Sequence, residues 1–191
     1  ITQLAASRIG ADFGKITIGT GGITGTFNLT VGGFGDIDIT GSITIGTGTV
    51  TKDGYGTYTP SNTGSTYSGA TTISAGILKL GASGGATNSP LGSGATAISI
   101  TSGATVDLNG FSMSGFAKGL TLAGIGAGSG DFATGALINS SGSSVTWSGT
   151  LVMTSPVLIK ANAGSISLTS TTAITTSGLA LTLGGSGTGS I

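Results

Sequence analysis

Few side chains in this sequence can carry acid–base chemistry. Histidine, cysteine and glutamate are absent, so catalysis near neutral pH would depend on six aspartates and the lysines. Asp36 and Asp38 are the best-placed pair, because they flank Ile37 and would point to the same side of a strand. Such a pair can cleave a glycosidic bond or bind calcium. We favour the simpler interpretation of two solvated strand residues, and we expect no catalytic residue, no metal site and no cofactor.

Aromatic side chains offer a second kind of chemistry, the stacking of sugar rings. Tyr58 and Trp147 are the candidate interaction residues, and Tyr55 and Tyr67 could join them along a groove for surface glycans. The alternative, which we favour, is that these rings pack at the corners of a coil or between subunits.

The elements that position these residues are predicted to be short strands. From Lys15 onward, apolar residues recur in pairs spaced by two, which puts both on one face of a strand. Gly, Ser-Gly or Asn-Gly follows within a few residues and favours a turn. No glycine-free segment has the apolar spacing of a helix, so the sequence predicts an all-β fold. The pairs are Ile16 and Ile18, Leu29 and Val31, Ile37 and Ile39, Ile43 and Ile45, Ile98 and Ile100, Val106 and Leu108, Leu120 and Leu122, Val145 and Trp147, Leu151 and Met153, Ile166 and Leu168, and Leu181 and Leu183.

Threonines that alternate with the apolar residues should face outward. Segments 47–49 and 57–59 read Thr-x-Thr, and a flat face of stacked Thr-x-Thr pairs can bind ice. That function requires the same register in several successive coils, which the sequence does not display. We therefore expect outward-facing strand residues without a specific ligand.

Composition excludes several classes of protein. Glycine supplies 39 of the 191 residues, but there are only 3 prolines and no Gly-X-Y period, which excludes collagen. The formal net charge is zero, so there is no basic surface for nucleic acid and no polybasic run for an anionic membrane. No apolar run reaches the ~18 residues of a membrane helix, so no membrane insertion is expected. The start lacks both Met and a signal-peptide pattern, which suggests a processed product or a piece of a longer chain.

Internal similarity predicts one repetitive segment over 1–191. Residues 16–33 and 166–185 share the order strand, small spacer, Ile, small spacer, strand and Gly-Gly, and they are interpreted as related repeat starts. Residues 1–15 are the least strand-like and are expected to form a cap or irregular lead-in. The segment is expected to belong to a longer repeat array or filament.

The segment 67–81, Tyr-Ser-Gly-Ala-Thr-Thr-Ile-Ser-Ala-Gly-Ile-Leu-Lys-Leu-Gly, closely resembles the autotransporter-associated β-strand repeat, also called the passenger-associated transport repeat. The resemblance implies a right-handed parallel β-helix in an exported bacterial surface protein, adhesin or filament. It covers about 15 residues and says nothing about activity. The residues that match are Tyr67, Gly69, Thr71, Thr72, Ile73, Gly76, Leu78, Leu80 and Gly81.

A parallel β-solenoid with roughly 20 residues per coil would have about nine or ten coils and a length near 45 Å. We expect a structural building block of an extracellular or cell-surface fibre, or of an adhesin stalk, that associates with itself through stacked rungs. The alternative is a module that binds carbohydrate or a host surface, and a polysaccharide-cleaving β-helix enzyme is disfavoured. The expected partners are further rungs, joined covalently or end to end, and surface glycans.

Overall fold

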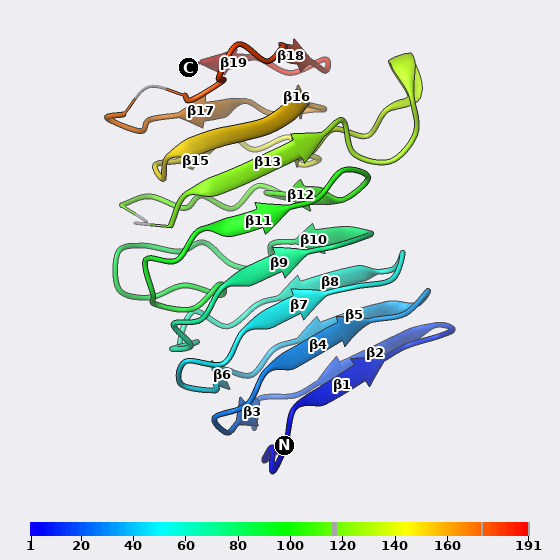
Figure 1. The fold of residues 1–191 in the computed structure, drawn as a ribbon, viewed down its shortest axis with the longest axis vertical. Helices are drawn as coiled ribbons and strands as arrows, with labels where there is room; N and C mark the ends of the chain where they lie inside the picture. The colour runs from blue at the N-terminus through cyan, green and yellow to red at the C-terminus, as the bar shows by residue number, and fades with distance from the viewer. Residues whose placement is uncertain (116–117, 173, 191) are drawn as a thin grey trace.

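The computed structural model is a parallel β-solenoid of about eight turns, which confirms the predicted fold class (Figure 1). The structure describes residues 1–115, 118–172 and 174–190. Within these ranges every pairing between named strands is parallel, and the only helical element is the three-residue 3-10 helix η1 (Gly130–Phe132). No helix in these ranges is long and apolar enough to cross a membrane. Each coil runs across three faces, which we call A, B and C.

The strands stack in three columns along the coil axis (Figure 1). Face A contains β1 (Ser7–Gly10), β4 (Leu29–Gly32), β7 (Val50–Lys52), β9 (Thr71–Ile73), β11 (Ile98–Ile100), β13 (Leu120–Gly124) and the first part of β16 (Leu151–Ala161). Face B contains β2 (Lys15–Ile18), β5 (Asp36–Ile39), β8 (Thr57–Pro60), β10 (Ile77–Lys79), β12 (Thr105–Asp107), β14 (Leu137–Asn139), the last part of β16 and β18 (Leu181–Gly184). Face C contains β3 (Ile23–Thr24), β6 (Ile43–Thr44), β15 (Val145–Trp147), β17 (Ile166–Leu168) and β19 (Gly189–Ser190).

Strand β16 belongs to both faces A and B. Its Leu151 pairs with Leu120 of β13 on face A, whereas its Ile159 pairs with Leu137 of β14 on face B. The register shifts between Leu122 and Gly124 of β13, which marks a bulge where the chain bends from one face to the next. Faces A and B are therefore continuous in one 14-stranded sheet.

The number of coils is smaller than the sequence predicts. Early coils keep a spacing of 21 residues, as between Leu29 and Val50. Later coils are longer, because Thr71 pairs with Ile98 and Leu120 pairs with Leu151. The extra residues form excursions between the strands, so the expected nine or ten coils become about eight. At ~4.8 Å per rung this shortens the rod to about 38 Å.

Like positions of successive coils fill the core. Inward side chains alternate with outward ones, and those at one position stack in register, which builds continuous apolar columns. From the second coil to the seventh, one such column on face A is at most 2% exposed: Leu29, Val50, Thr71, Ile98, Leu120 and Leu151. The alternation predicted from the paired apolar residues thus places most of the core, although the pairs of the first and last coils are half-buried or exposed.

Residues 1–15, expected to form a cap or irregular lead-in, contain one complete strand. Strand β1 lies within them and pairs in parallel with β4, so they begin the first coil. Ile9 is the only large apolar residue of this strand, so no pair of apolar residues spaced by two marks it in the sequence. The similar segments 16–33 and 166–185 start on different faces, with Ile16 in β2 on face B and Ile166 in β17 on face C. Ala173 of the second segment lies outside the described residues.

Candidate functional site

The predicted carboxylate pair lies on the outer side of face B. Asp36 and Asp38 flank buried Ile37 in β5, as the strand periodicity predicts. The Asp36 carboxylate accepts a hydrogen bond from the backbone N–H of Thr57, 2.9 Å away in the next coil. Asp38 forms an ion pair with Lys15 of the previous coil, and this bond raises the pKa of Lys15. Each carboxylate therefore has a structural partner in a neighbouring coil.

No cluster of metal ligands accompanies these carboxylates. Across 1–115, 118–172 and 174–190, no three His, Cys, Asp or Glu side chains come together. The two carboxylates also serve different partners, since one accepts from a backbone amide and the other pairs with an ammonium group. Their arrangement agrees with two strand residues that tie adjacent coils together.

The predicted interaction aromatics Tyr58 and Trp147 are inside the coil. Tyr58 is 1% exposed and Trp147 is 0% exposed, so neither ring can contact an external ligand in this fold. Tyr58 occupies an inward position of β8, in register between Ile37 and Leu78. Burial raises the pKa of its phenol well above the ordinary value. Both rings fill the core, which agrees with a packing role rather than with a sugar-binding groove.

The repeat motif at 67–81 contains the face A and face B strands of one coil. Thr71, Thr72 and Ile73 are β9 on face A, Gly76 turns the corner with a φ of +67°, and Leu78 lies in β10 on face B. A Cβ at Gly69 would lie 2.3 Å from the carbonyl oxygen of Gly48, so only glycine fits there. Leu80 is buried in the core, and Gly81 follows it just after the end of β10. The motif residues therefore define a solenoid coil through its turns and its buried positions.

Tyr67 begins that coil from inside the core. Its hydroxyl group lies 2.9 Å from the Thr71 hydroxyl, and the ammonium group of Lys118 lies 4.8 Å from the centre of its ring. Lys118 also donates a hydrogen bond to the Leu91 carbonyl. Burial lowers the pKa of Lys118 to about 8. Tyr67 thus supports a buried cation from the inner side of the coil.

Lys52 is a second buried cation, at the corner between faces A and B. It stands in an aliphatic column between Val31 and Ile73, and it is 1% exposed. Its Nζ donates to the carbonyls of Asp53, Gly54 and Ala75 at 2.6, 2.7 and 3.2 Å. Burial lowers its pKa to about 8. Three carbonyl acceptors from two coils make Lys52 a structural bracket for this corner.

Three exposed aromatic residues, Phe13, Phe34 and Tyr55, form a group that the sequence patterns above did not identify. They are 95%, 73% and 75% exposed and follow one another at intervals of 21 residues, one in each of the first three coils. The rings of Phe34 and Tyr55 are 5.7 Å apart between centroids and inclined at 36°. We call these three residues the aromatic ladder. Their 21-residue spacing and adjacent glycines were the sequence signal that could have identified them.

The Thr-x-Thr segments do not share one face. Residues 57–59 belong to β8 on face B, whereas 47–49 precede β7 of face A. The structure instead stacks hydroxyl groups at one outward position of face A, in a register that the sequence did not display. An ion pair between Arg8 and Asp53 lies on the outside of the first coils of this face. The members of the column are Thr30, Thr51, Thr72, Ser99 and Thr121.

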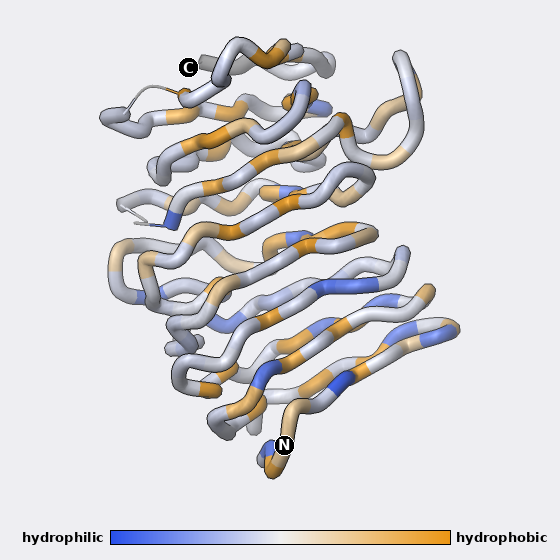
Figure 2. The backbone as a smooth tube through the Cα atoms, in the orientation of Figure 1, coloured by the Kyte–Doolittle hydropathy of each residue, from blue (hydrophilic) through white to orange (hydrophobic). Residues whose placement is uncertain are grey.

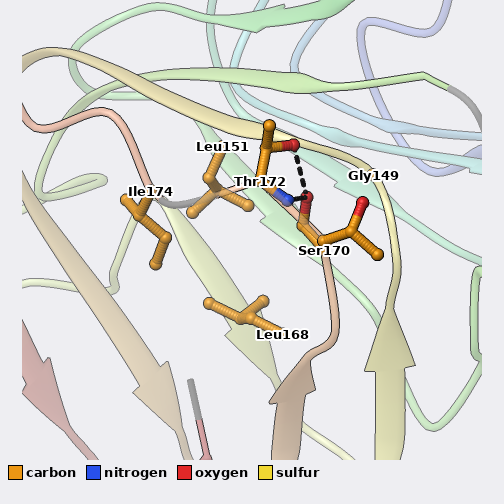
Figure 3. A pocket seen from close by; sticks show the side chains of 7 residues that line it. Gly149, Leu151, Leu168, Ser170, Thr172 and Ile174 are labelled. Atoms are coloured by element: carbon orange, nitrogen blue, oxygen red, sulfur yellow. Dashed lines mark hydrogen bonds between the residues drawn. The ribbon is translucent and has the colours of Figure 1, made fainter.

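A small hollow lies between the seventh and eighth coils. Figure 3 shows its apolar side chains, Leu151, Leu168 and Ile174, beside Ser170 and Thr172, which are joined by hydrogen bonds. Its volume of about 140 Å³ is below the ~300–1,000 Å³ of typical small-molecule sites. The hollow is therefore best described as incomplete packing of the core.

The fold and these surfaces define the class of protein: a parallel β-solenoid in which buried polar side chains form hydrogen bonds between adjacent coils. Comparisons with family models, with curated proteins and with solved structures find no match for this chain. The similarity to the autotransporter-associated repeat therefore depends on the motif at 67–81.

Proposed function

We propose that this chain is a structural segment of an exported bacterial surface fibre or adhesin stalk, with a mechanical rather than a catalytic role. The observation that supports this role is the continuity of the coil: parallel ladders and apolar columns extend through all of its about eight turns. In a solenoid each coil contacts only its neighbours, so the rod can lengthen without a wider core.

The two outermost coils present unfinished core columns. Ile16 and Ile18 of β2 are half-buried in the first coil, and Leu183 of β18 is 57% exposed in the last. Leu183 stands in register with buried Ile159, so it continues a core column. Among the described residues, β18 pairs only with β16, which leaves its other edge able to accept a strand. We propose that further coils cover both surfaces, either from the same polypeptide or from an identical neighbour.

The resemblance at 67–81 supports export to the cell surface. A low content of charged residues, 6%, and a core of stacked aliphatic side chains suit a stiff extracellular rod. A glycan- or host-binding module of an autotransporter passenger is the second candidate, and the exposed aromatic ladder is the observation that favours it. The two roles are compatible, because a rod can carry a binding surface on its side.

The test is assembly of the purified chain, followed by electron microscopy, light scattering and a denaturing gel. We expect filaments that dissolve into subunits near 18.0 kDa if coils stack between copies. Native material that forms filaments but runs far larger would show a covalent array. In the stacking case, Leu183→Lys should lower the filament yield at least tenfold, because it places a charge where a further coil would pack. Thr182→Lys, on the outer side of the same strand, is the matched control.

Discrete monomers of the purified chain, together with the absence of a larger native form, would overturn the fibre proposal. Equal filament yields from Leu183→Lys and Thr182→Lys would exclude stacking through this end.

A further inference from the structure

The aromatic ladder is displayed along the corner between faces A and B. Phe13 follows β1, Phe34 follows β4 and Tyr55 follows β7, so each ring occupies the same corner of its coil. In Figure 1 these three corners are stacked beside one another, along the direction of the coil axis. The ladder ends in the fourth coil, where the small residue Ala75 precedes Gly76.

The backbone beneath the ladder is rigid because the corners are hydrogen-bonded to one another. The N–H of Gly35 donates to Ala11 at 2.7 Å, and the N–H of Gly56 donates to Gly33 at 3.0 Å. A Cβ at Gly56 would lie 1.9 Å from the carbonyl oxygen of Gly35, so the close stacking requires glycine. The rings are thus presented on a preorganised support, which lowers the entropic cost of binding.

Charged groups are concentrated around the same three coils. Figure 2 shows strongly hydrophilic segments in these N-terminal coils, in a chain that is otherwise poor in charge. Seven of the twelve charged residues lie between positions 8 and 53, three of them cationic and four anionic. Apart from Lys52, which is buried, they place both cationic and anionic side chains close to the ladder in the chain, and the two signs nearly balance. The seven are Arg8, Asp12, Lys15, Asp36, Asp38, Lys52 and Asp53.

We propose that the aromatic ladder binds a neutral polysaccharide chain laid parallel to the coil axis. The CH-rich face of a sugar ring packs on an aromatic face, while its hydroxyl groups reach polar side chains at the rim. The ladder repeats once per coil, and the 5.7 Å between the ring centres of Phe34 and Tyr55 suits a polymer that also repeats along its length. Asp36, Lys15 and the Tyr55 hydroxyl provide polar groups near the rings in sequence.

The size and charge of this surface disfavour the other occupants. Three aromatic side chains can bury about 450–750 Å² in total. A stable contact between two protein copies needs about 800 Å² from each partner. The near balance of three cations and four anions also gives no attraction to an anionic membrane. A narrow, uncharged polymer fits these observations better than a protein partner or a lipid surface.

The test compares the native chain with the triple variant Phe13→Ala, Phe34→Ala and Tyr55→Ala. Native affinity gels would contain hydroxyethylcellulose, xylan, mannan or laminarin, and pull-downs would use insoluble cellulose and chitin. We expect at least one polysaccharide to bind the native chain, with a loss of at least tenfold in the triple variant. Phe132→Ala is the matched control, because Phe132 is 91% exposed but lies outside the ladder, in η1.

Because the three rings are exposed, their removal should not unfold the chain. Far-UV circular dichroism would check that the triple variant keeps its fold. Failure of every polysaccharide in the panel to bind would overturn the proposal, as would equal binding by the triple variant. Ladder-dependent binding to phosphatidylcholine vesicles without binding to polysaccharide would assign the site to lipid. The inference is independent of the fibre proposal, since the triple variant should still form filaments wherever the native chain does.

Discussion

The buried ammonium group of Lys52 predicts an unusual dependence of stability on pH. The side chain occupies a core column, and its Nζ contacts only backbone carbonyls among the hydrogen bonds observed. Its pKa is about 8 in the folded chain, against an ordinary value of 10.5. Between these values the unfolded chain binds more protons than the folded chain. The free energy of unfolding should therefore rise as the pH increases from 8 towards 10.5.

The size of the effect follows from the difference in pKa. The difference between a pKa of 10.5 and one of about 8 corresponds to roughly 3–4 kcal/mol, and screening near the corner reduces this to about 1–2 kcal/mol. Lys52→Met removes the titrating group and keeps an unbranched side chain in the column. The variant should therefore lose about 1–2 kcal/mol of the increase seen in the native chain between pH 8 and pH 10. Lys118, whose pKa is also lowered to about 8, supplies the remaining rise.

Urea unfolding at pH 7.5, 8, 9 and 10, followed by circular dichroism, measures this difference. Thr51→Met is the control, because it adds the same side chain at the neighbouring outward position of β7 and removes no titrating group. NMR titration of the lysine Cε resonances reads the pKa of Lys52 directly. An identical pH dependence in the native chain and in Lys52→Met, or a Lys52 titration near 10.5, would refute the reasoning.

Three further predictions test the buried polar side chains and the turns. Asn139→Leu should lower the free energy of unfolding by about 2–4 kcal/mol, because the buried side-chain amide forms hydrogen bonds with the backbone of Gly110, Ser141, Ser143 and Ser165. The control Asn28→Leu loses one exposed hydrogen bond and should lower it by less than about 1 kcal/mol. Equal losses in the two variants would contradict this prediction. In the same urea assay, Gly56→Ala should lower the free energy of unfolding by about 1–3 kcal/mol, because the new Cβ would collide with the backbone of the previous coil. Gly19→Ala, whose Cβ would have open space around it, should change the free energy little. Similar values for both variants would argue against close stacking of the corners. Above pH 10 the free energy of unfolding should fall, because burial raises the pKa of the Tyr67 phenol and the phenol therefore ionises first in the unfolded chain. Tyr67→Phe should make this fall shallower. An unchanged slope in the variant would refute Tyr67 as the cause.

Local sequence patterns were sufficient to predict the strands and most of the core. The alternation around Ile37 placed Asp36 and Asp38 outside the coil, and the structure agrees. Such patterns are local, because side chains on a strand point to opposite sides with a period of two. Short glycine-bounded strands also exclude helices and favour stacked coils.

The coil number and the first coil could not be predicted in this way. Coil length depends on how far the chain departs from the rod between strands, and residues 82–90, which lie in the coil between Thr71 and Ile98, have no apolar period. Residues 7–10 became a strand only because β4 supplies its hydrogen-bond partners. Both features depend on pairing between residues far apart in the chain.

Local residue patterns are enough to predict a β-solenoid, but the stacking of its coils controls which polar and aromatic residues face water. Tyr55 and Tyr58 are three residues apart, yet one is 75% exposed at a corner and the other is 1% exposed in the core. Lys52 is buried although lysine usually lies at the surface. The physical reason is register: each coil stacks on the next, and that stacking selects which corners form a ladder and which carbonyls surround a cation.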